Sequence, residues 1–223
     1  ILEIEKIAKI KKTVVDIGIR LNPNTDAKTI NQISTGKKEN KFGVDEKVFL
    51  ELVKYVKNSQ NLRLKCLSVH IGSQILDHKP FKKMLNVLNR IIKKTKYIFE
   101  YIDLGGGMGI DYAHNRKNLN VKKYSQNITS FLKKNNSKII FEPGRFIIGN
   151  TAILVSQVIY VKESGKKKFI ILDAAMNDFM RPALYNAKHK IIAVKKNKSI
   201  LKKTYEFVGP ICESTDKFLT IKK

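Results

Sequence analysis

The amino-acid sequence predicts an α/β fold, in which the C-terminal half of a (β/α)8 TIM-type barrel is followed by part of a mainly antiparallel β domain. Strand-like apolar runs alternate with amphipathic helical stretches over residues 1–147, which indicates a parallel sheet with helices outside. Unusual polar residues follow the end of each strand, and barrels of this type collect functional groups at the carboxyl ends of their strands. After residue 147, short strand-like runs follow one another instead.

The barrel elements follow from hydrophobic spacing. A period near that of a helix predicts one apolar face, whereas a short continuous apolar run bounded by turn residues predicts a buried strand. The predicted elements are a helix over residues 1–12, a strand over 14–21, a helix over 48–56, a strand over 64–71, a helix over 81–92, a strand over 97–102, a helix over 121–135 and a strand over 138–141. Four strands amount to about half of an eight-stranded barrel.

The remainder of the chain predicts β structure. Strand-like runs cover residues 151–161, 168–172, 190–194 and 205–208, and no convincing amphipathic helix separates them. We therefore expect a partial barrel over residues 1–147 and a partial C-terminal β domain over residues 148–223. Ile1 begins inside an amphipathic pattern without an initiating Met, and residues 218–223 look like a strand cut in mid-course, so the chain is expected to be an excerpt of a longer protein.

The amino-acid composition limits the classes of function that the chain can have. The chain has 223 residues, 43% of them hydrophobic, which suffices for one large domain or two small ones. No apolar run has the length of a membrane span, so no membrane partner is expected. Two cysteines, Cys66 and Cys212, are too few for a disulfide framework or a metal cluster. We therefore predict no metal site and a cytoplasmic location.

The formal net charge of +25 would suit a nucleic-acid partner. Lysine supplies nearly all of the excess, and the lysines are spread over every predicted helix among asparagine and isoleucine. Surfaces that read bases favour arginine, whose planar fork matches base edges and phosphates. The arginines are only Arg20, Arg63, Arg90, Arg116, Arg145 and Arg181. A biased coding composition explains the lysines more simply, and no nucleic-acid partner is expected.

Three consecutive glycines, Gly105, Gly106 and Gly107, follow the third predicted strand. Without side chains they leave backbone N–H groups bare, and such a concavity suits a phosphate. A tight strand-to-helix turn would explain the same residues, and the run alone does not decide between the two. It is not a dinucleotide-binding fingerprint, because the required third glycine falls on Ile110, and no Gly-Lys-Ser/Thr phosphate loop follows.

Further polar motifs stand at comparable positions, and each has a plain structural explanation when taken alone. In chain order they are Ile33-Ser34-Thr35-Gly36 with Asn40-Lys41-Phe42-Gly43, His70-Ile71-Gly72-Ser73-Gln74, Asp103-Leu104-Gly105-Gly106-Gly107, Glu142-Pro143-Gly144-Arg145, Asp173-Ala174-Ala175-Met176-Asn177-Asp178, Arg181-Pro182-Ala183-Leu184-Tyr185 and Cys212-Glu213-Ser214-Thr215-Asp216. With this order and spacing, the sequence resembles the diaminopimelate decarboxylase family. Members of that family are pyridoxal-phosphate enzymes with an alanine-racemase-like (fold-type III) barrel.

The resemblance implies that the barrel binds pyridoxal 5'-phosphate. It places the cofactor phosphate on Gly105–Gly107, with Ser73 as a hydroxyl donor. His70, one of two implied catalytic residues, would lie flat against the pyridine ring. Glu142 would meet the pyridine nitrogen and keep it protonated, which lets the ring accept the electrons that departing CO₂ leaves behind. The other implied cofactor-binding residues are Gly144 and Arg145.

The resemblance also implies a substrate site. Arg145, Arg181 and Tyr185 would hold substrate carboxylate, which suits the bidentate geometry of guanidinium. Cys212, the second implied catalytic residue, would donate the proton that replaces CO₂. Glu213 would bind the distal ammonium of the substrate. In the family this Cys-Glu pair reaches into the active site of the other subunit, so a homodimer with shared active sites is expected.

The implied reaction converts the amino acid meso-2,6-diaminopimelate to L-lysine and CO₂, the last step of lysine biosynthesis. A related decarboxylase for ornithine, arginine or carboxynorspermidine is the alternative, although Glu213 and the pair Arg181 and Tyr185 argue against ornithine, which has no distal carboxylate. The family forms a Schiff base through a lysine in a Tyr-Ala-x-Lys-Ala-like context. No such context is present, so this lysine is expected upstream of Ile1 and a late tyrosine beyond Lys223, and the chain alone is expected to be inactive.

Overall fold

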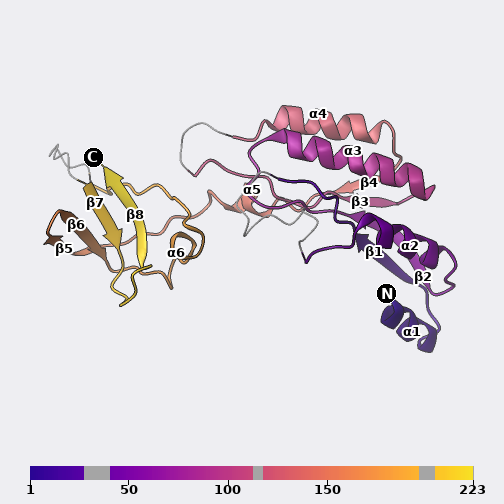
Figure 1. Cartoon of the computed structure of the whole chain (residues 1–223), viewed down its shortest axis with the longest axis horizontal. Helices are drawn as coiled ribbons and strands as arrows, with labels where there is room; N and C mark the ends of the chain where they lie inside the picture. The colour runs from indigo at the N-terminus through magenta and orange to yellow at the C-terminus, as the bar shows by residue number, and fades with distance from the viewer. Residues whose placement is uncertain (28–40, 113–117, 196–203, 223) are drawn as a thin grey trace. The chain divides into compact units, whose positions relative to one another are not determined.

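The computed structural model describes residues 1–27, 41–112, 118–195 and 204–222. The chain forms two compact units, each with its own four-stranded sheet (Figure 1). The first unit holds the described residues of 1–110 and 118–151. The second holds Asp111, Tyr112 and the described residues from 152 onward. The domain boundary expected between residues 147 and 148 stays a prediction.

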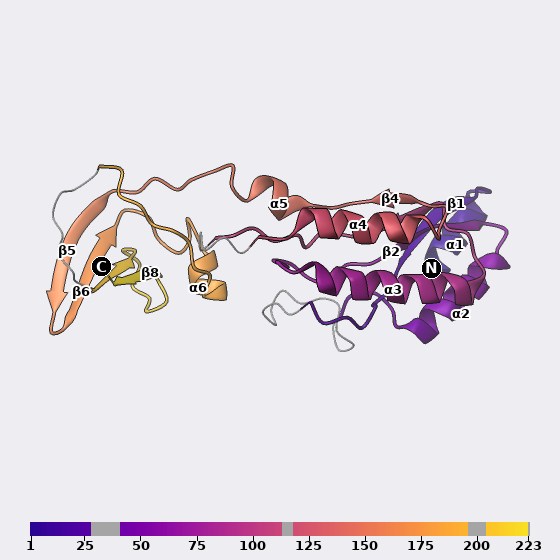
Figure 2. The same cartoon turned by 90° about the horizontal axis from the view of Figure 1, so that it is seen from above.

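The first unit is built on a parallel sheet with the strand order β1-β2-β3-β4. Its elements are α1 (Leu2–Ile10), β1 (Val15–Arg20), α2 (Glu46–Lys57), β2 (Leu62–Ser68), α3 (His78–Thr95), β3 (Tyr101–Asp103), α4 (Val121–Leu132), β4 (Lys138–Ile140) and α5 (Gly144–Ile148). Helices α2, α3 and α4 lie along one side of the sheet, and α3 and α4 run side by side (Figures 1 and 2). The predicted partial barrel is therefore confirmed.

Helix starts follow from capping residues in the sequence. Asp45 accepts the N–H of Val48 at 2.9 Å where α2 begins. Asp77 accepts the N–H of Lys79 at 2.9 Å where α3 begins. Such caps satisfy N–H groups that the first turn of a helix leaves without partners. Helix α3 then ends at Lys96, which adopts a left-handed conformation with φ of 49°.

An apolar core fills the space between these helices and the sheet. The largest buried side chains are aromatic and come from the three helices α2, α3 and α4 and from the approach to β3: Phe49, Phe81, Phe131 and Phe99, none more than 2% exposed. The ring of Phe81 meets that of Tyr124 on α4 edge-on, with centroids 4.7 Å apart. Burial of this kind stabilises each ring by roughly 1.5–3 kcal/mol. The core thereby fixes the sheet and the carboxyl ends of its strands.

The second unit is a mixed sheet with the order β5-β6-β7-β8. Its elements are β5 (Val158–Ser164), β6 (Lys167–Leu172), α6 (Arg181–Tyr185), β7 (Thr204–Val208) and β8 (Lys217–Lys222). β5 and β6 pair antiparallel, as do β7 and β8, whereas β6 and β7 pair parallel. The sheet is thus mainly antiparallel, as the sequence predicts. Every residue of β5 is exposed.

Two strand predictions in this unit were wrong. Residues 190–194 form no strand, although their isoleucines and valine suit one. The strand predicted over 151–161 begins only at Val158. The last pair between β5 and β6 joins Val158 to Leu172. Just beyond it, the carboxylate of Asp173 accepts the N–H of Gln157 at 2.8 Å, while the Asp173 N–H donates to the oxygen of Gln157 at 3.0 Å. Residue preference alone does not make a strand, because a strand also needs a neighbour to pair with.

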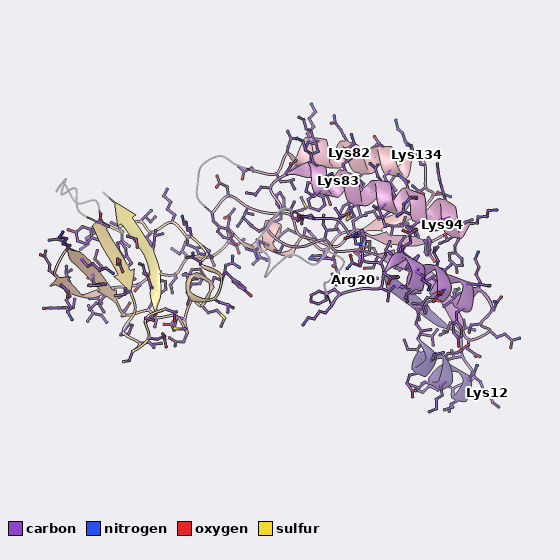
Figure 3. All side chains as sticks on the ribbon, viewed as in Figure 1. Lys12, Arg20, Lys82, Lys83, Lys94 and Lys134 are labelled. Carbon is purple, nitrogen blue, oxygen red and sulfur yellow. The ribbon has the colours of Figure 1, made fainter. Side chains whose placement is uncertain are left out.

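The positive charge lies on helix surfaces. Lys82, Lys83 and Lys94 of α3 are exposed, as is Lys134 beyond α4, and Figure 3 labels these four side chains. Carboxylates are interspersed, since Glu46 of α2 meets both Arg90 and Lys94 of α3. Among the described residues, no helix is both long and apolar enough to cross a membrane.

Candidate cofactor and substrate site

Three loops meet at the carboxyl ends of β2, β3 and β4 in the first unit. The loop after β2 carries His70 and Ser73, the loop after β3 carries the glycine run Gly105–Gly107, and the loop after β4 carries Glu142. Parallel strands bring their carboxyl ends to one edge of a sheet, so the order of the strands alone makes these loops neighbours. The hydrogen bonds that follow show how closely they pack.

Gly106 joins all three loops. Its N–H donates to Nδ1 of His70 at 3.1 Å. A Cβ placed on Gly106 would stand 2.0 Å from the backbone oxygen of Glu142, a separation that no real side chain reaches. The N–H of Glu142 in turn donates to the oxygen of Gly105 at 2.9 Å. Only glycine at position 106 lets the three loops approach one another this closely.

Gly105 is required for its backbone conformation. Its φ is +65°, and a Cβ there would meet the oxygen of Val69 at 2.6 Å. Its N–H donates to Oδ1 of Asp103 at 2.8 Å. The N–H groups of Gly105 and Gly106 are thus engaged by the chain itself. Close packing between the loops accounts for both glycines.

Gly107 is the member of the run that best fits a phosphate. Within the described part of the chain, its N–H has no hydrogen-bond acceptor. Gly107 lies against Gly72, because a Cβ on Gly107 would be 2.1 Å from the oxygen of Gly72. The residue after Gly72 is Ser73, so the loop that packs against Gly107 carries a hydroxyl. A backbone donor with a neighbouring hydroxyl is the donor set of a phosphate site, and the residues present fit that group.

His70 is held as a neutral imidazole. Burial lowers the pKa of His70, the nearby positive charge of Arg20 lowers it further, and Asp103 opposes both effects. Because the Gly106 N–H is a donor, Nδ1 must accept, and the neutral ring then carries its proton on Nε2. Arg20, at the end of β1, also donates to the backbone oxygen of His70 at 3.3 Å. A neutral ring is suited to lie flat against another aromatic ring.

Glu142, Gly144 and Arg145 follow β4. The carboxylate of Glu142 is exposed at the strand end, where it can reach a bound group. The N–H of Gly144 donates to the oxygen of Glu142 at 2.9 Å, which turns the chain into the short helix α5. Arg145 lies in the first turn of α5. The structure therefore places His70, Gly106 and Glu142 together, with Gly144 and Arg145 directly beyond.

The predicted substrate residues Arg181 and Tyr185 belong to the second unit, on α6. The Arg181 guanidinium carbon lies 5.7 Å from the centroid of the Tyr185 ring and 5.4 Å from that of Tyr112. These separations lie in the range of cation–π contacts. The two rings contact the guanidinium, and its Nε donates to Nε2 of His189 at 3.4 Å. Arg181 is thus a preorganised cation.

The predicted pair Cys212 and Glu213 lies on an exposed loop between β7 and β8. The buried carboxylate of Asp216, 3% exposed, holds this loop. One of its oxygens accepts the N–H of Ile211 at 2.9 Å, and the other accepts the N–H of Met176 at 2.7 Å. Two charge-assisted bonds to backbone donors fix the loop against the segment that leads into α6.

Sequence reasoning gave no role to two residues that shape these loops, Asp103 and Asp216. Their signal was present in the motifs, since Asp103 stands two residues before the first glycine and Asp216 four residues after Cys212. Short acidic side chains beside turns commonly accept local backbone N–H groups. The motif Ile33–Gly36 lies outside the described residues.

A half-barrel that carries an imidazole, a glycine run and a carboxylate at the ends of successive strands defines a phosphate-cofactor protein of the barrel type. The family described as "Pyridoxal-dependent decarboxylase, pyridoxal binding domain" matches residues 1–149. The chain belongs to this family, and its cofactor is pyridoxal phosphate.

Curated relatives agree with this assignment. Diaminopimelate decarboxylase of Helicobacter pylori is 42% identical over 219 residues, which are 97% of this chain and 54% of that protein. The enzyme of the same name from Aquifex aeolicus is 41% identical over 204 residues, which are 90% of this chain and 48% of that protein. The chain therefore spans about half the length of the curated relatives it matches.

Two solved structures of enzymes named diaminopimelate decarboxylase are also similar to this chain. Diaminopimelate decarboxylase from Helicobacter pylori, complexed with L-lysine, superimposes with a TM-score of 0.89 at 40% identity and covers 98% of this chain and 56% of that one. Diaminopimelate decarboxylase from M. jannaschii superimposes with a TM-score of 0.84 at 32% identity, over 100% of this chain and 54% of that one. The fold predicted from the sequence is confirmed by both.

Proposed function

We propose that the complete protein that carries this chain, with any flanking sequence its gene encodes, converts meso-2,6-diaminopimelate to L-lysine and CO₂. The observation that carries the proposal is the meeting of His70, Gly106 and Glu142 at the ends of three parallel strands. Relatives about 40% identical bear the name diaminopimelate decarboxylase, and one was solved with L-lysine, the expected product. The substrate is therefore an amino acid.

The first unit would hold the cofactor. Bound pyridoxal phosphate supplies an electron sink for the electron pair that CO₂ leaves behind. The N–H of Gly107 and the hydroxyl of Ser73 would bind its phosphate, with Gly105 and Gly106 keeping the loops in place. Neutral His70 would lie against the pyridine ring, and Glu142 would hold a proton at the pyridine nitrogen. Gly144 and Arg145 complete this proposed set.

The second unit would hold the substrate. A substrate carboxylate would be bound by Arg181, Tyr185 and Arg145. The guanidinium of arginine suits this role because it is planar and always charged, and that of Arg181 contacts the Tyr185 ring. Glu213 would receive the distal ammonium, and Cys212 would donate the proton to the carbon that loses CO₂. We further propose that the protein is a homodimer in which Cys212 and Glu213 of each subunit contribute to the active site of the other. We also propose that it is located in the cytoplasm. The dimer would bring the exposed loop to a second active site.

Release of CO₂ from candidate substrates tests the function. The complete protein with pyridoxal phosphate should decarboxylate diaminopimelate with a kcat/KM at least about a hundredfold above that for ornithine, arginine or carboxynorspermidine, because each of these lacks the matched second carboxylate or ammonium. Preference for any of the three would replace the proposed substrate while leaving the family assignment intact. Failure with all four would contradict a decarboxylase function.

A matched pair of variants tests the role of Glu142. Glu142→Gln should lower kcat by about a hundredfold or more, since a neutral amide does not keep the pyridine nitrogen protonated. Glu100→Gln makes the same change just before β3, at the opposite end of the sheet, where Glu100 contacts only surface lysines among its ion pairs in the described residues. It should leave kcat within about twofold. Equal effects of the two variants would contradict the proposed role.

A further inference from the structure

His189 lies beside Arg181 because helix α6 ends at Tyr185 and the chain then reverses direction. Asn186 closes the helix in a left-handed conformation with φ of 52°. The N–H of Ala187 donates to the backbone oxygen of Arg181 at 3.4 Å, which folds the chain back along the helix. His189, eight residues after Arg181, then lies against the arginine side chain. Backbone geometry, and not a long-range contact, brings the two together.

A directional hydrogen bond joins the two side chains. Nε of Arg181 donates to Nε2 of His189 at 3.4 Å. A guanidinium has donors only, so the imidazole must accept, and a neutral ring then carries its proton on Nδ1. This bond occupies the Nε edge of Arg181. Within the described residues, the two terminal nitrogens, Nη1 and Nη2, make no hydrogen bond, which leaves them to bind a carboxylate end-on in a bidentate fork.

Aromatic rings hold this arrangement. The His189 ring meets the rings of Tyr112 and Phe179 edge-on, with both centroid separations at 4.6 Å and interplanar angles of 67° and 68°. Tyr112 also lies under the Arg181 guanidinium. One tyrosine therefore contacts both partners of the hydrogen bond. All four residues belong to the second unit.

We propose that His189 is a positioning residue that presents Arg181 end-on to a carboxylate of the substrate. The proposal rests on the proposed function, in which Arg181 binds that carboxylate. Ordering a long side chain during binding lowers affinity, and a side chain already held in place avoids that loss. His189 would thus set the affinity for substrates that keep a carboxylate distant from the reacting carbon. It would not take part in the chemical step.

Inhibition by product and product analogue tests this in the complete protein with pyridoxal phosphate. His189→Phe keeps an aromatic ring but removes the acceptor, and it should weaken inhibition by L-lysine roughly tenfold. It should raise KM for diaminopimelate by a similar factor and leave kcat within about twofold, because uniform binding is lost. Inhibition by cadaverine, which is lysine without its carboxylate, should be unchanged. His189→Gln, whose amide oxygen accepts, should recover most of the loss.

Controls separate a positioning role from a merely structural one. His78→Phe makes the same replacement on α3 in the other unit, where His78 contacts Asn127, and should leave inhibition by L-lysine unchanged. Equal weakening of L-lysine and cadaverine by His189→Phe would contradict the proposal, and so would a loss confined to kcat. No recovery in His189→Gln would also contradict it.

Nitrogen NMR of the histidine rings distinguishes failure of this inference from failure of the proposed function. In the wild type, Nε2 of His189 should be the unprotonated nitrogen, and Arg181→Lys, which removes the Nε donor, should change its shift. That result would support the Arg181–His189 bond even if diaminopimelate is not the substrate. A proton on Nε2 in the wild type would overturn the inference even if CO₂ is released as proposed.

Discussion

The two units fix their functional loops by different means. In the first unit, β2 buries Leu62, Leu64 and Leu67 in the core, and the loops after the strands are joined by close contacts such as those of Gly106. In the second unit, β5 is exposed along its whole length, and the loops are held by polar side chains such as Asp216 and Arg181. The difference shows which substitutions should weaken the functional loops of each unit.

Vulnerability follows from how widely the stabilisation is shared. A loop anchored on a packed core depends on many contacts, each of which contributes a small part. A loop anchored on one buried carboxylate depends on that carboxylate's two hydrogen bonds, and the loss of either leaves a half-buried backbone N–H without its acceptor. We therefore expect core and close-approach substitutions to matter most in the first unit, and single polar substitutions to matter most in the second.

The largest expected effect is Phe81→Ala in the core of the first unit. Phe81 is 0% exposed, and its removal should cost about 4 kcal/mol of unfolding free energy, because the cavity cannot close fully. Tyr160→Ala on β5, where the side chain is 62% exposed, should change stability by no more than about 0.5 kcal/mol. Urea unfolding of the complete protein measures both. A loss at Tyr160 as large as that at Phe81 would break the comparison, since that face would then be covered.

The next effect is Gly106→Ala, which tests close approach instead of burial. The added Cβ would overlap the oxygen of Glu142, so the loops after β3 and β4 must separate, at a cost of about 3 kcal/mol. Gly144→Ala is the matched control, because a Cβ there meets nothing within 4 Å. It should change the unfolding free energy by less than about 1 kcal/mol. Equal losses in the two variants would show that Gly106 is not a packing position.

In the second unit, Asp216→Asn should cost about 2 kcal/mol, because the new amide nitrogen, a donor, would face a half-buried backbone N–H where the buried carboxylate now offers an acceptor. The same replacement at the exposed cap Asp45, where asparagine caps equally well, should be near neutral. Thermal unfolding of the complete protein measures both. A neutral Asp216→Asn would mean that the loop carrying Cys212 is fixed by something else.

The sequence was sufficient to predict the helices and strands of the first unit because their hydrophobic residues recur with a regular period. The 3.6-residue stripe of α3 and the buried run of β2 depend on local spacing, which any reading of the chain detects. Sequence order then placed His70, Gly106 and Glu142 at one sheet edge without further information. What the sequence could not decide is which glycine N–H groups the chain itself uses, because that depends on distances between loops.

Sequence was less informative for the second unit. Residues 190–194 have the composition of a strand, yet they lack a pairing partner among the described residues, and composition does not report partners. The bond between Arg181 and His189 likewise depends on a left-handed residue, Asn186, that ends a helix of five residues. Short helices without an amphipathic stripe leave almost no periodic signal.

The smallest expected effects are those of exposed ion pairs, and they should not distinguish the units. In the first, Asp16 on β1 faces Arg63 on β2 at 2.5 Å and also meets Lys65. Hydrogen bonding to Arg63, then to Lys65, lowers the pKa of Asp16 from 3.8 to about 2. The folded state therefore releases this proton more readily, so the contribution to stability is present above pH 3.8 and lost as the pH falls through about 2.

The second unit has a matched pair, Glu163 and Lys168, which face each other across β5 and β6. Asp16→Asn and Glu163→Gln should each change stability little near neutral pH, because water and salt screen exposed charges. Carboxyl NMR should show Asp16 still ionised at pH values where free aspartate is half protonated. A large loss in Glu163→Gln, with none in Asp16→Asn, would mean that the second unit depends on polar contacts even at its surface, and would extend the contrast from the loops to the sheet.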